Sequence, residues 1–242
     1  MVKNVQQTRR LVAFGLFIFI SLIAVALNST TPPEPPVQTA NSKPITEVAG
    51  VSTERASEAL AKLAVKGRAP KTNYAREQFS DGWADVEGCD MRNYILQRDL
   101  TNVVLAEDNC MVNSGTLNDP YTNTVIQFRR GNATSARVQI DHVVALSDAW
   151  QKGAQNIDVS LRAQFANDPL NLLAVDGPAN QQKSDGDAAT WLPKNKNYRC
   201  QYVARQIAVK TKYHLWVTAA ESGAMATVLG ACPDQVLPIV GE

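Results

Sequence analysis

The sequence predicts an α+β fold, and three observations support this. Residues 137–140 alternate polar and apolar, which is typical of a half-buried β-strand, and this strand ends in the dipeptide Asp141-His142. A second short apolar run, residues 169–176, fits another strand. Helical patterns flank this pair, and four cysteines offer covalent cross-links. The expected order is strand, insertion, strand, helix, embedded in a helical domain.

Residues 1–28 have the pattern of an export signal. Basic residues precede an uncharged apolar run of 17 residues, 11–27, and Ala24 and Ala26 form an A-x-A cleavage site. The run is longer than the usual apolar core of a cleaved signal and shorter than the ~20 residues that span a bilayer comfortably. A cleaved signal peptide and an uncleaved membrane anchor both remain open. Either one places the rest of the chain outside the cell or in the cell envelope.

The chain after the signal divides into a linker, a helix with its connector, and one large domain. Residues 29–50 are rich in Pro, Ser and Thr and contain too few large apolar residues to form a core. A helix is expected from Val51, with Gly67 ending it. Residues 51–72 are therefore interpreted as helix and connector, and residues 73–242 as the folded domain.

The four cysteines lie beyond the export signal, where oxidation is permitted. Neighbour pairing, Cys89 with Cys110 and Cys200 with Cys232, closes the shortest loops among the three possible pairings. A zinc site built from all four thiolates is the alternative. Structural zinc sites usually draw ligands from close pairs, and the chain contains no C-x-x-C. The spacing favours two disulfides with a stabilising role.

Charge is distributed unevenly, although the formal net charge is only +1. Residues 77–119 carry nine acidic residues and two basic ones, whereas residues 183–212 carry seven basic residues and two acidic ones. A local basic stretch is the footprint expected of a protein that binds phosphates, but ordinary solvated surfaces also show it. Composition alone indicates a globular protein and no particular activity.

The second strand leads into a helix that carries two polar residues on one face. Pro178 occupies the first helical position after a turn, and the following residues open the helix. Asn180 and Lys183 are three residues apart, so they share a face of that helix.

Histidine and tryptophan are rare in this chain. His142 is one of two histidines, and the other, His214, falls in a helix expected over residues 199–218 and is interpreted as structural. The tryptophans could stack on nucleobases, but in a chain of this size they are more simply core anchors. They are Trp83, Trp150, Trp191 and Trp216.

In combination, these features resemble the ββα-metal motif of HNH endonucleases. The Asp-His pair at the end of the first strand, the Asn-Leu pair of the second and the Asn-x-x-Lys of the helix carry the likeness. The blocks AW-x-x-GA, FANDPLNL and N-x-x-KSDGD are similar to one branch, secreted actinobacterial proteins related to the C-terminal nuclease domain of a modification-dependent restriction enzyme. The likeness covers roughly residues 74–200, with the motif core at 137–187.

The resemblance implies a role for each residue of the motif. His142 would be the general base that deprotonates a water, and Asp141 would be a ligand of a single divalent cation. Asn180 stands where the letter pattern has His, and would be the other ligand or would position it. Asn171 would hold the loop after the first strand and orient the imidazole, and Lys183 would contact the scissile or a neighbouring phosphate.

Phosphodiester hydrolysis independently requires these residue types. The substrate is anionic, so a cation must neutralise developing charge, and a base with a pKa near neutrality must activate water. Histidine is the side chain that meets the second need. Carboxylate and amide oxygens are hard ligands, which suit Mg²⁺ or Mn²⁺ better than zinc.

The expected function is a secreted or membrane-tethered, metal-dependent endonuclease that acts on DNA, with RNA as a further candidate substrate. No recognition helix or zinc-finger reader is evident, so phosphate contacts would dominate binding and sequence specificity would be low. Two alternatives stay open: a non-catalytic cell-envelope binding module, and a phosphodiesterase for another extracellular polymer. The sequence identifies no protein partner.

Overall fold

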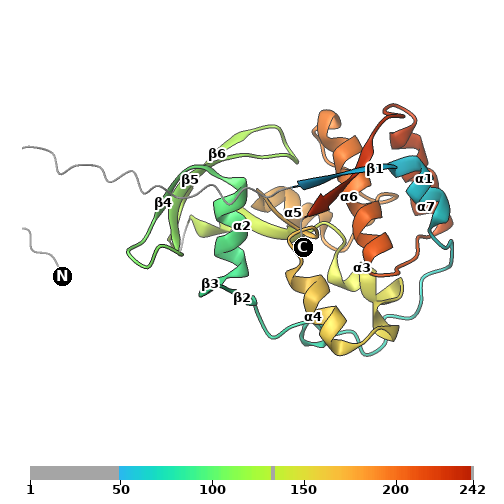
Figure 1. Cartoon of the computed structure of the whole chain (residues 1–242), viewed down its shortest axis with the longest axis horizontal. Coiled ribbons are helices and arrows are strands. Elements are labelled where there is room, and N and C mark those ends of the chain that lie inside the picture. Colours follow the sequence, from blue (N-terminus) through green and yellow to red (C-terminus); the bar gives the residue numbers. More distant parts are fainter. Residues whose placement is uncertain (1–48, 132–133, 241–242) are drawn as a thin grey trace, which may run out of the picture. The chain divides into compact units, whose positions relative to one another are not determined.

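The computed structural model describes residues 49–131 and 134–240, which are coloured in Figure 1. These residues all belong to one compact unit, Ser42–Glu242; the other unit, Met1–Asn41, lies outside the described part. The expected export signal and all but the last two residues of the expected linker therefore lie outside the described residues. Within the described residues, none of the helices has the length and apolar character needed to cross a membrane.

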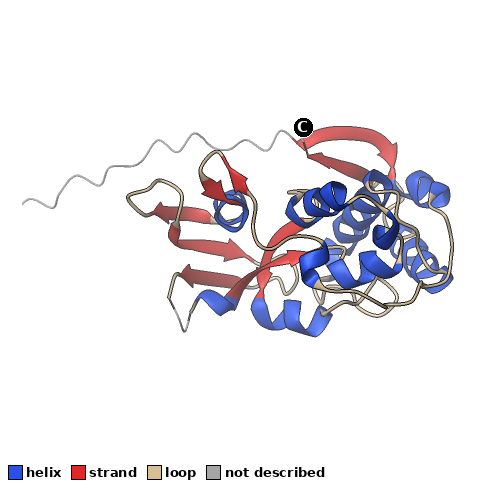
Figure 2. Ribbon diagram, turned by 90° about the horizontal axis from the view of Figure 1, so that it is seen from below, coloured by secondary structure: helices blue, strands red, loops and turns tan. Residues whose placement is uncertain are grey.

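The described chain contains both helices and strands (Figure 2). The helices are α1 (Ala56–Lys62), α2 (Met91–Asp99), α3 (Leu146–Gln151), α4 (Val159–Asn167), α5 (Gly177–Lys183), α6 (Arg199–Lys212) and α7 (Ala219–Leu229). The strands are β1 (Ala49–Arg55), β2 (Asp85–Val86), β3 (Cys89–Asp90), β4 (Thr101–Leu105), β5 (Val112–Asn118), β6 (Val125–Arg129), β7 (Val138–His142), β8 (Leu172–Asp176) and β9 (Val236–Val240). A mixed α+β fold, as expected from the sequence, is confirmed.

Strands β7 and β8 pair antiparallel, with Val138 opposite Asp176 and His142 opposite Leu172. Helices α3 and α4 fill the insertion between them. Asp176 ends β8 and caps α5, because its carboxylate accepts a hydrogen bond from the Ala179 backbone N–H. The expected order of strand, insertion, strand and helix is thus the order observed.

The β7–β8 pair lies between a helical side and a side that also contains a sheet. Helices α1, α6 and α7 lie on the helical side, whereas α2 and the antiparallel sheet β4-β5-β6 lie on the other (Figure 1). The sheet side has its own small core, which includes Val112, Leu117, Ile126 and Phe128. The expectation of a motif surrounded by helices is therefore wrong for this side, where alternating residues of β5 and β6 bury one face of a sheet.

The first residues of the helix predicted from Val51 form a strand instead. Residues Ala49–Arg55 form β1, which pairs antiparallel with β9, and α1 begins only at Ala56. The partner strand lies nearly two hundred residues away in the sequence, since Ala49 pairs with Val240. A prediction from local helix propensity does not include the backbone hydrogen bonds of such a pairing. Ala56, Ala59 and Leu60 of α1 are buried in the main core. The boundary drawn at residue 73 stays a prediction, because segments on both sides of it belong to the same compact unit.

The helix expected over residues 199–218 ends earlier than predicted. Helix α6 stops at Lys212, and His214 follows in a turn with a left-handed backbone (φ 53°) and an exposed side chain. Histidine adopts this conformation more readily than most residues, which suits it to the end of a helix.

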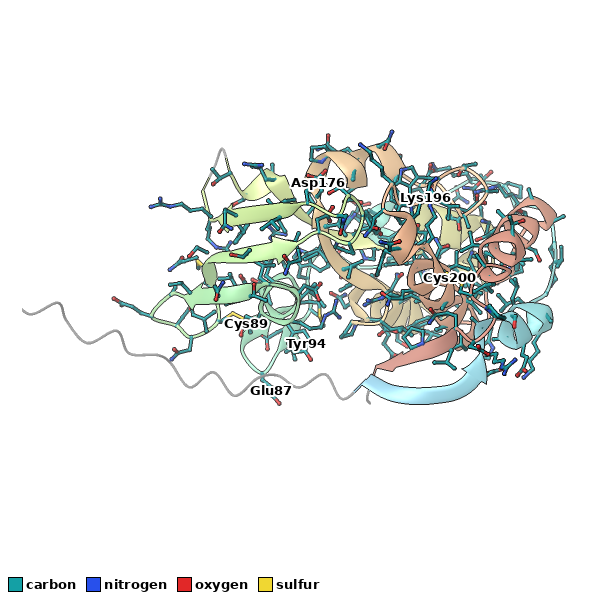
Figure 3. All side chains as sticks on the ribbon, turned by 90° about the horizontal axis from the view of Figure 1, so that it is seen from above. Glu87, Cys89, Tyr94, Asp176, Lys196 and Cys200 are labelled. Carbon is teal, nitrogen blue, oxygen red and sulfur yellow. A yellow bond between two sulfur atoms is a disulfide. The ribbon has the colours of Figure 1, made fainter. Side chains whose placement is uncertain are left out.

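Two disulfides form by neighbour pairing. Cys89 of β3 pairs with Cys110 in the loop before β5, and their Cα atoms lie 5.3 Å apart. Cys200 of α6 pairs with Cys232 after α7, with a Cα separation of 6.4 Å. Figure 3 shows Cys89 on the side of the three-stranded sheet and Cys200 on the helical side. The pairing favoured by loop length is the pairing found, and no thiol remains for a four-cysteine zinc site.

Candidate functional site

One cleft brings together three of the residues singled out from the sequence. Asp141 and His142 end β7, Asn180 lies on α5, and all three line a hollow of about 380 Å³. Helix α5 follows β8 after a single capped turn, so it returns across the strand pair toward the end of β7. The cleft is thus built where strand and helix meet, and we call it the His142 cleft.

Asp141 is buried, and both of its carboxylate oxygens are held. Oδ1 accepts a hydrogen bond from the Lys183 ammonium at 2.9 Å, and Oδ2 accepts one from the Tyr121 hydroxyl. Burial raises the pKa of Asp141, and the positive charge of Lys183 opposes that rise. Burial also raises the pKa of Tyr121 well above its ordinary value, so the phenol remains a donor. Each carboxylate oxygen keeps lone-pair capacity beyond the bond it already accepts.

His142 is 7% exposed, and its ring is fixed in one tautomer. Nε2 lies 2.8 Å from the Ala166 carbonyl, which can only accept, so Nε2 carries the proton. In the neutral ring, Nδ1 then has a free lone pair. Burial lowers the pKa of His142 to about 3, and Arg76 and Lys183 add to the lowering while the Ala166 carbonyl opposes it. The imidazole is therefore neutral at physiological pH and able to accept a proton.

Asn171 ties together the segments that flank His142. Its side chain is fully buried; Oδ1 accepts a hydrogen bond from Val144 N–H at 2.8 Å, and Nδ2 donates to the Val144 and Phe165 carbonyls. The Asn171 carbonyl also accepts from Val143 N–H. These bonds fix the loop that follows β7, which is the position expected for this residue. Asn171 does not line the cleft.

Asn180 presents an amide oxygen at the cleft. Its Nδ2 donates to Gln139 Oε1 at 2.9 Å, which orients the amide from the neighbouring strand. Within the described part of the chain, no donor contacts Asn180 Oδ1. The half-buried amide therefore has an available acceptor, and its residue lines the same hollow as Asp141.

Lys183 lies beneath the cleft and not on its surface. The side chain is fully buried, and its ammonium donates to Asp141 Oδ1 at 2.9 Å and to the His142 carbonyl at 2.8 Å. The expected contact with a phosphate has no support from this geometry, because the charge is already used to hold the Asp-His dipeptide. The i, i+3 spacing correctly placed Lys183 on the face of Asn180, but spacing carries no information about depth.

The cleft also contains cations that were not singled out from the sequence. Lys71 and Arg76 line it beside Tyr74, although this segment lies at the edge of the predicted domain. Arg76 is exposed and has no ion-pair partner among the described residues, whereas Lys71 pairs with Asp185 at 3.2 Å. Two basic residues within six positions, in the sequence KTNYAR, were the only available signal.

A second group of charges does not line the cleft and is sealed from solvent except at one residue. Lys152 contacts Asp148, Asp187 and Glu221 at 2.6–2.7 Å, and Lys210 contacts two of the same carboxylates. The partly exposed Arg68 completes the group, which holds three cations and three carboxylates. We call it the closed ion cluster: Arg68, Asp148, Lys152, Asp187, Lys210 and Glu221. Lys183 and Lys210 are both buried in ion pairs. Two of the positive charges in the basic stretch at residues 183–212 are therefore not available to bind phosphates.

Comparison with known proteins places the chain in a family. Residues 90–228, more than half of the chain, match the family described as GmrSD restriction endonucleases, C-terminal domain. A relative from Arthroderma benhamiae (strain ATCC MYA-4681 / CBS 112371), named "Uncharacterized secreted protein", is 36% identical over 184 residues, which is 75% of this chain and 86% of the relative. This relative is fungal, so the expected actinobacterial branch is not confirmed. No solved structure matches. On the family match and this identity together, the chain belongs to the family of GmrSD restriction endonuclease C-terminal domains.

Proposed function

We propose that this protein is a metal-dependent endonuclease of the HNH, ββα-metal type, which hydrolyses phosphodiester bonds of DNA with low sequence specificity. The observation that carries the proposal is the convergence of Asp141, His142 and Asn180 on one cleft in a family of restriction endonuclease domains. A carboxylate and an amide oxygen can hold a divalent cation, and a neutral imidazole can accept a proton from water.

The residues present fit a divalent cation with hard oxygen ligands. Asp141 and the Asn180 amide oxygen would hold it, because both line the cleft and both retain acceptor capacity. The described residues contain no cluster of three or more His, Cys, Asp or Glu side chains that could hold a metal. Two protein ligands are typical of Mg²⁺ or Mn²⁺, which keep several waters and bind substrate phosphates. Such an ion would neutralise charge that develops on the phosphate.

His142 would take the proton from the attacking water. Its Nε2–H is committed to the Ala166 carbonyl, so Nδ1 is the atom that accepts. A pKa of about 3 keeps the ring neutral but makes it a weak base in the ligand-free protein. A bound phosphodiester brings negative charge beside the ring, which favours its protonated form and strengthens it as a base.

The remaining residues would position the reacting groups. Asn171 fixes the loop after β7 through Val144, and Lys183 anchors Asp141 from below. Arg76 is an exposed cation at the cleft and, unlike Lys71, has no ion-pair partner among the described residues, so it would bind the phosphate in the place first expected of Lys183.

Export of the protein is part of this proposal. The fungal relative is named a secreted protein, and both disulfides require an oxidising compartment. The predicted signal at residues 1–28 would direct that export. Attachment to a membrane would depend on whether residues 11–27 are retained.

The test is cleavage of plasmid DNA by the purified protein with Mg²⁺ or Mn²⁺, with and without EDTA. We expect nicking of the plasmid only when the metal is present. The affinity for Mn²⁺, measured from a binding isotherm, should be lower in Asp141→Asn and in Asn180→Ala. Asp234→Asn is the matched control, because Asp234 is an exposed carboxylate that pairs with Arg55 and does not line the cleft. Mn²⁺ binding without hydrolysis of any nucleic acid would favour a phosphodiesterase for another polymer, and the absence of both would favour a binding module.

A further inference from the structure

His142 borders two hollows, and only one of them has a part in the proposed chemistry. The His142 cleft contains the carboxylates Asp141 and Asp185. The other hollow, of about 160 Å³, also borders the imidazole, and we call it the Trp83 pocket. Its lining residues are Arg76, Ser80, Gly82, Trp83, His142, Leu146 and Ala166.

The two hollows meet at the residues expected to handle the phosphate. Arg76, His142 and Leu146 line both of them. A phosphate held by Arg76 and approached from His142 therefore has the Trp83 pocket directly beside it. A nucleic acid chain continues on both sides of each phosphate, so one neighbouring nucleotide must lie at or near this pocket.

The lining of the Trp83 pocket suits an uncharged aromatic group. It contains no carboxylate, and Arg76 is the only Lys or Arg among its lining residues. The half-buried indole of Trp83 lies nearly parallel to the His142 ring, at an interplanar angle of 10° and a centroid separation of 6.0 Å. Every nucleobase has a flat π-face, and stacking on an aromatic side chain is tolerant of sequence.

The segment that carries Trp83 is held in place before any ligand binds. Asn167 of α4 accepts a hydrogen bond from Ala84 N–H at 2.8 Å, and the Ala84 carbonyl accepts one from Met91 N–H. Both bonds anchor the backbone of the residue that follows Trp83, in the segment that places the indole beside the imidazole. Such a preformed pocket lowers the cost of ordering side chains on binding.

We propose that the Trp83 pocket binds the base of the nucleotide next to the scissile phosphate, and that the preferred substrate is consequently single-stranded nucleic acid. A base in a duplex is paired and stacked, and must be extruded at a cost before it can enter a pocket beside its own phosphate. An unpaired base enters without that cost. This inference rests on the proposed endonuclease activity and specifies its substrate.

The test compares one oligonucleotide, single-stranded and annealed to its complement, as substrate for the purified protein. We expect a higher kcat/KM on the single strand. Trp83→Leu should lower kcat/KM on the single strand by about 5- to 150-fold, mainly through KM, whereas Trp83→Phe keeps a flat ring and most of the rate. Trp216→Leu is the matched control, since Trp216 lines neither hollow. Melting temperatures establish that each variant is folded.

Removing the base from the substrate gives an independent arm. A single strand with abasic nucleotides should be a poor substrate for the wild type, and Trp83→Leu should then cause little further loss, because the two changes remove the same contact. Equal cleavage of single and double strands, or an equal loss on both in Trp83→Leu, would overturn this inference and leave the endonuclease proposal standing. Failure to cleave either form would remove both.

Discussion

Beneath the cleft, Asp141 shares its carboxylate between Lys183 and Tyr121, whereas in the closed ion cluster Lys152 contacts three carboxylates at once. Both groups are buried and both contain lysine ammoniums with no exposed side-chain surface. Asp141 and His142 nevertheless line a hollow and have acceptor atoms to spare, whereas in the closed ion cluster cations and carboxylates balance one another.

Buried charge alone does not identify a functional site in this protein. Structural ion-pair networks also perturb pKa values, as catalytic groups do. Access to a hollow separates the two groups here, because none of the six residues of the closed ion cluster lines the His142 cleft. Changes in the first group should therefore affect cleavage, and changes in the second should affect stability.

The largest expected effect is on the cleft side. His142→Ala should lower the cleavage rate by roughly two to four orders of magnitude, the range typical for loss of a positioned acid-base group, while Mn²⁺ binding through Asp141 persists. Single-turnover rates and a binding isotherm measure the two quantities. His142→Asn, which fills more of the space, should be as inactive. Wild-type cleavage in His142→Ala would make this imidazole a structural residue like those of the closed ion cluster.

For the closed ion cluster we expect the opposite pattern, a loss of stability without a loss of cleavage. Lys152→Met leaves three buried carboxylates without their shared cation, which should cost about 3–5 kcal/mol of the free energy of unfolding. Folded protein should still cleave DNA at close to the wild-type rate. Urea unfolding and rates measured well below the melting temperature test this. Lys196→Met, at an exposed lysine, is the control and should change neither quantity.

How far the sequence predicted this arrangement depends on the range of the interactions. The β7–β8–α5 order follows from local patterns, namely alternation at residues 137–140 and a capped proline turn at Asp176, and it was predicted. The strands β1 and β9 pair across the length of the chain, so no local signal revealed them. The sheet β4-β5-β6 was missed because its strands are rich in polar residues, and only their buried faces alternate.

The candidate site shows the same division. Asp141, His142 and Asn180 were singled out through a motif whose members lie on consecutive elements. Arg76 was missed, since it precedes the motif and reaches the cleft only through tertiary packing. The burial of Lys183 was also missed, because helical spacing defines a face and not a depth.

Lys183 offers a direct comparison with Lys152. Lys183→Met should cost about 3 kcal/mol, the lower end for a broken buried pair, because Asp141 keeps its bond from Tyr121 and borders the cleft. Unlike Lys152→Met, this variant should also lose Mn²⁺ affinity and cleavage, since Asp141 loses its anchor. Unfolding in urea and Mn²⁺ titration separate the two losses. A Lys183→Met protein with full activity would show that this lysine belongs with the structural ion pairs.

The smallest expected effect is a difference in pH window. The folded pKa of His142 is about 3, below its ordinary 6.5, because burial disfavours the charged ring. Between these two pKa values the imidazole is protonated in the unfolded chain and neutral in the native chain. The free energy of unfolding therefore falls as the pH decreases from 6.5. One pKa unit corresponds to about 1.4 kcal/mol, so roughly 2 kcal/mol should be lost by about pH 5.

Asp187 of the closed ion cluster should lose its contribution only at lower pH. Burial alone would raise its pKa, but the contacts with Lys152 and Arg68 lower it below the ordinary 3.8. Its stabilisation is therefore fully present above that value and is lost as the pH falls through the lower folded pKa. Urea unfolding in EDTA, between pH 6.5 and about pH 5, should show a slope that His142→Asn removes and Asp187→Asn leaves unchanged. If His142→Asn kept the wild-type slope, the imidazole would be solvated in solution, and the contrast between the two groups of buried polar residues would fail at its central residue.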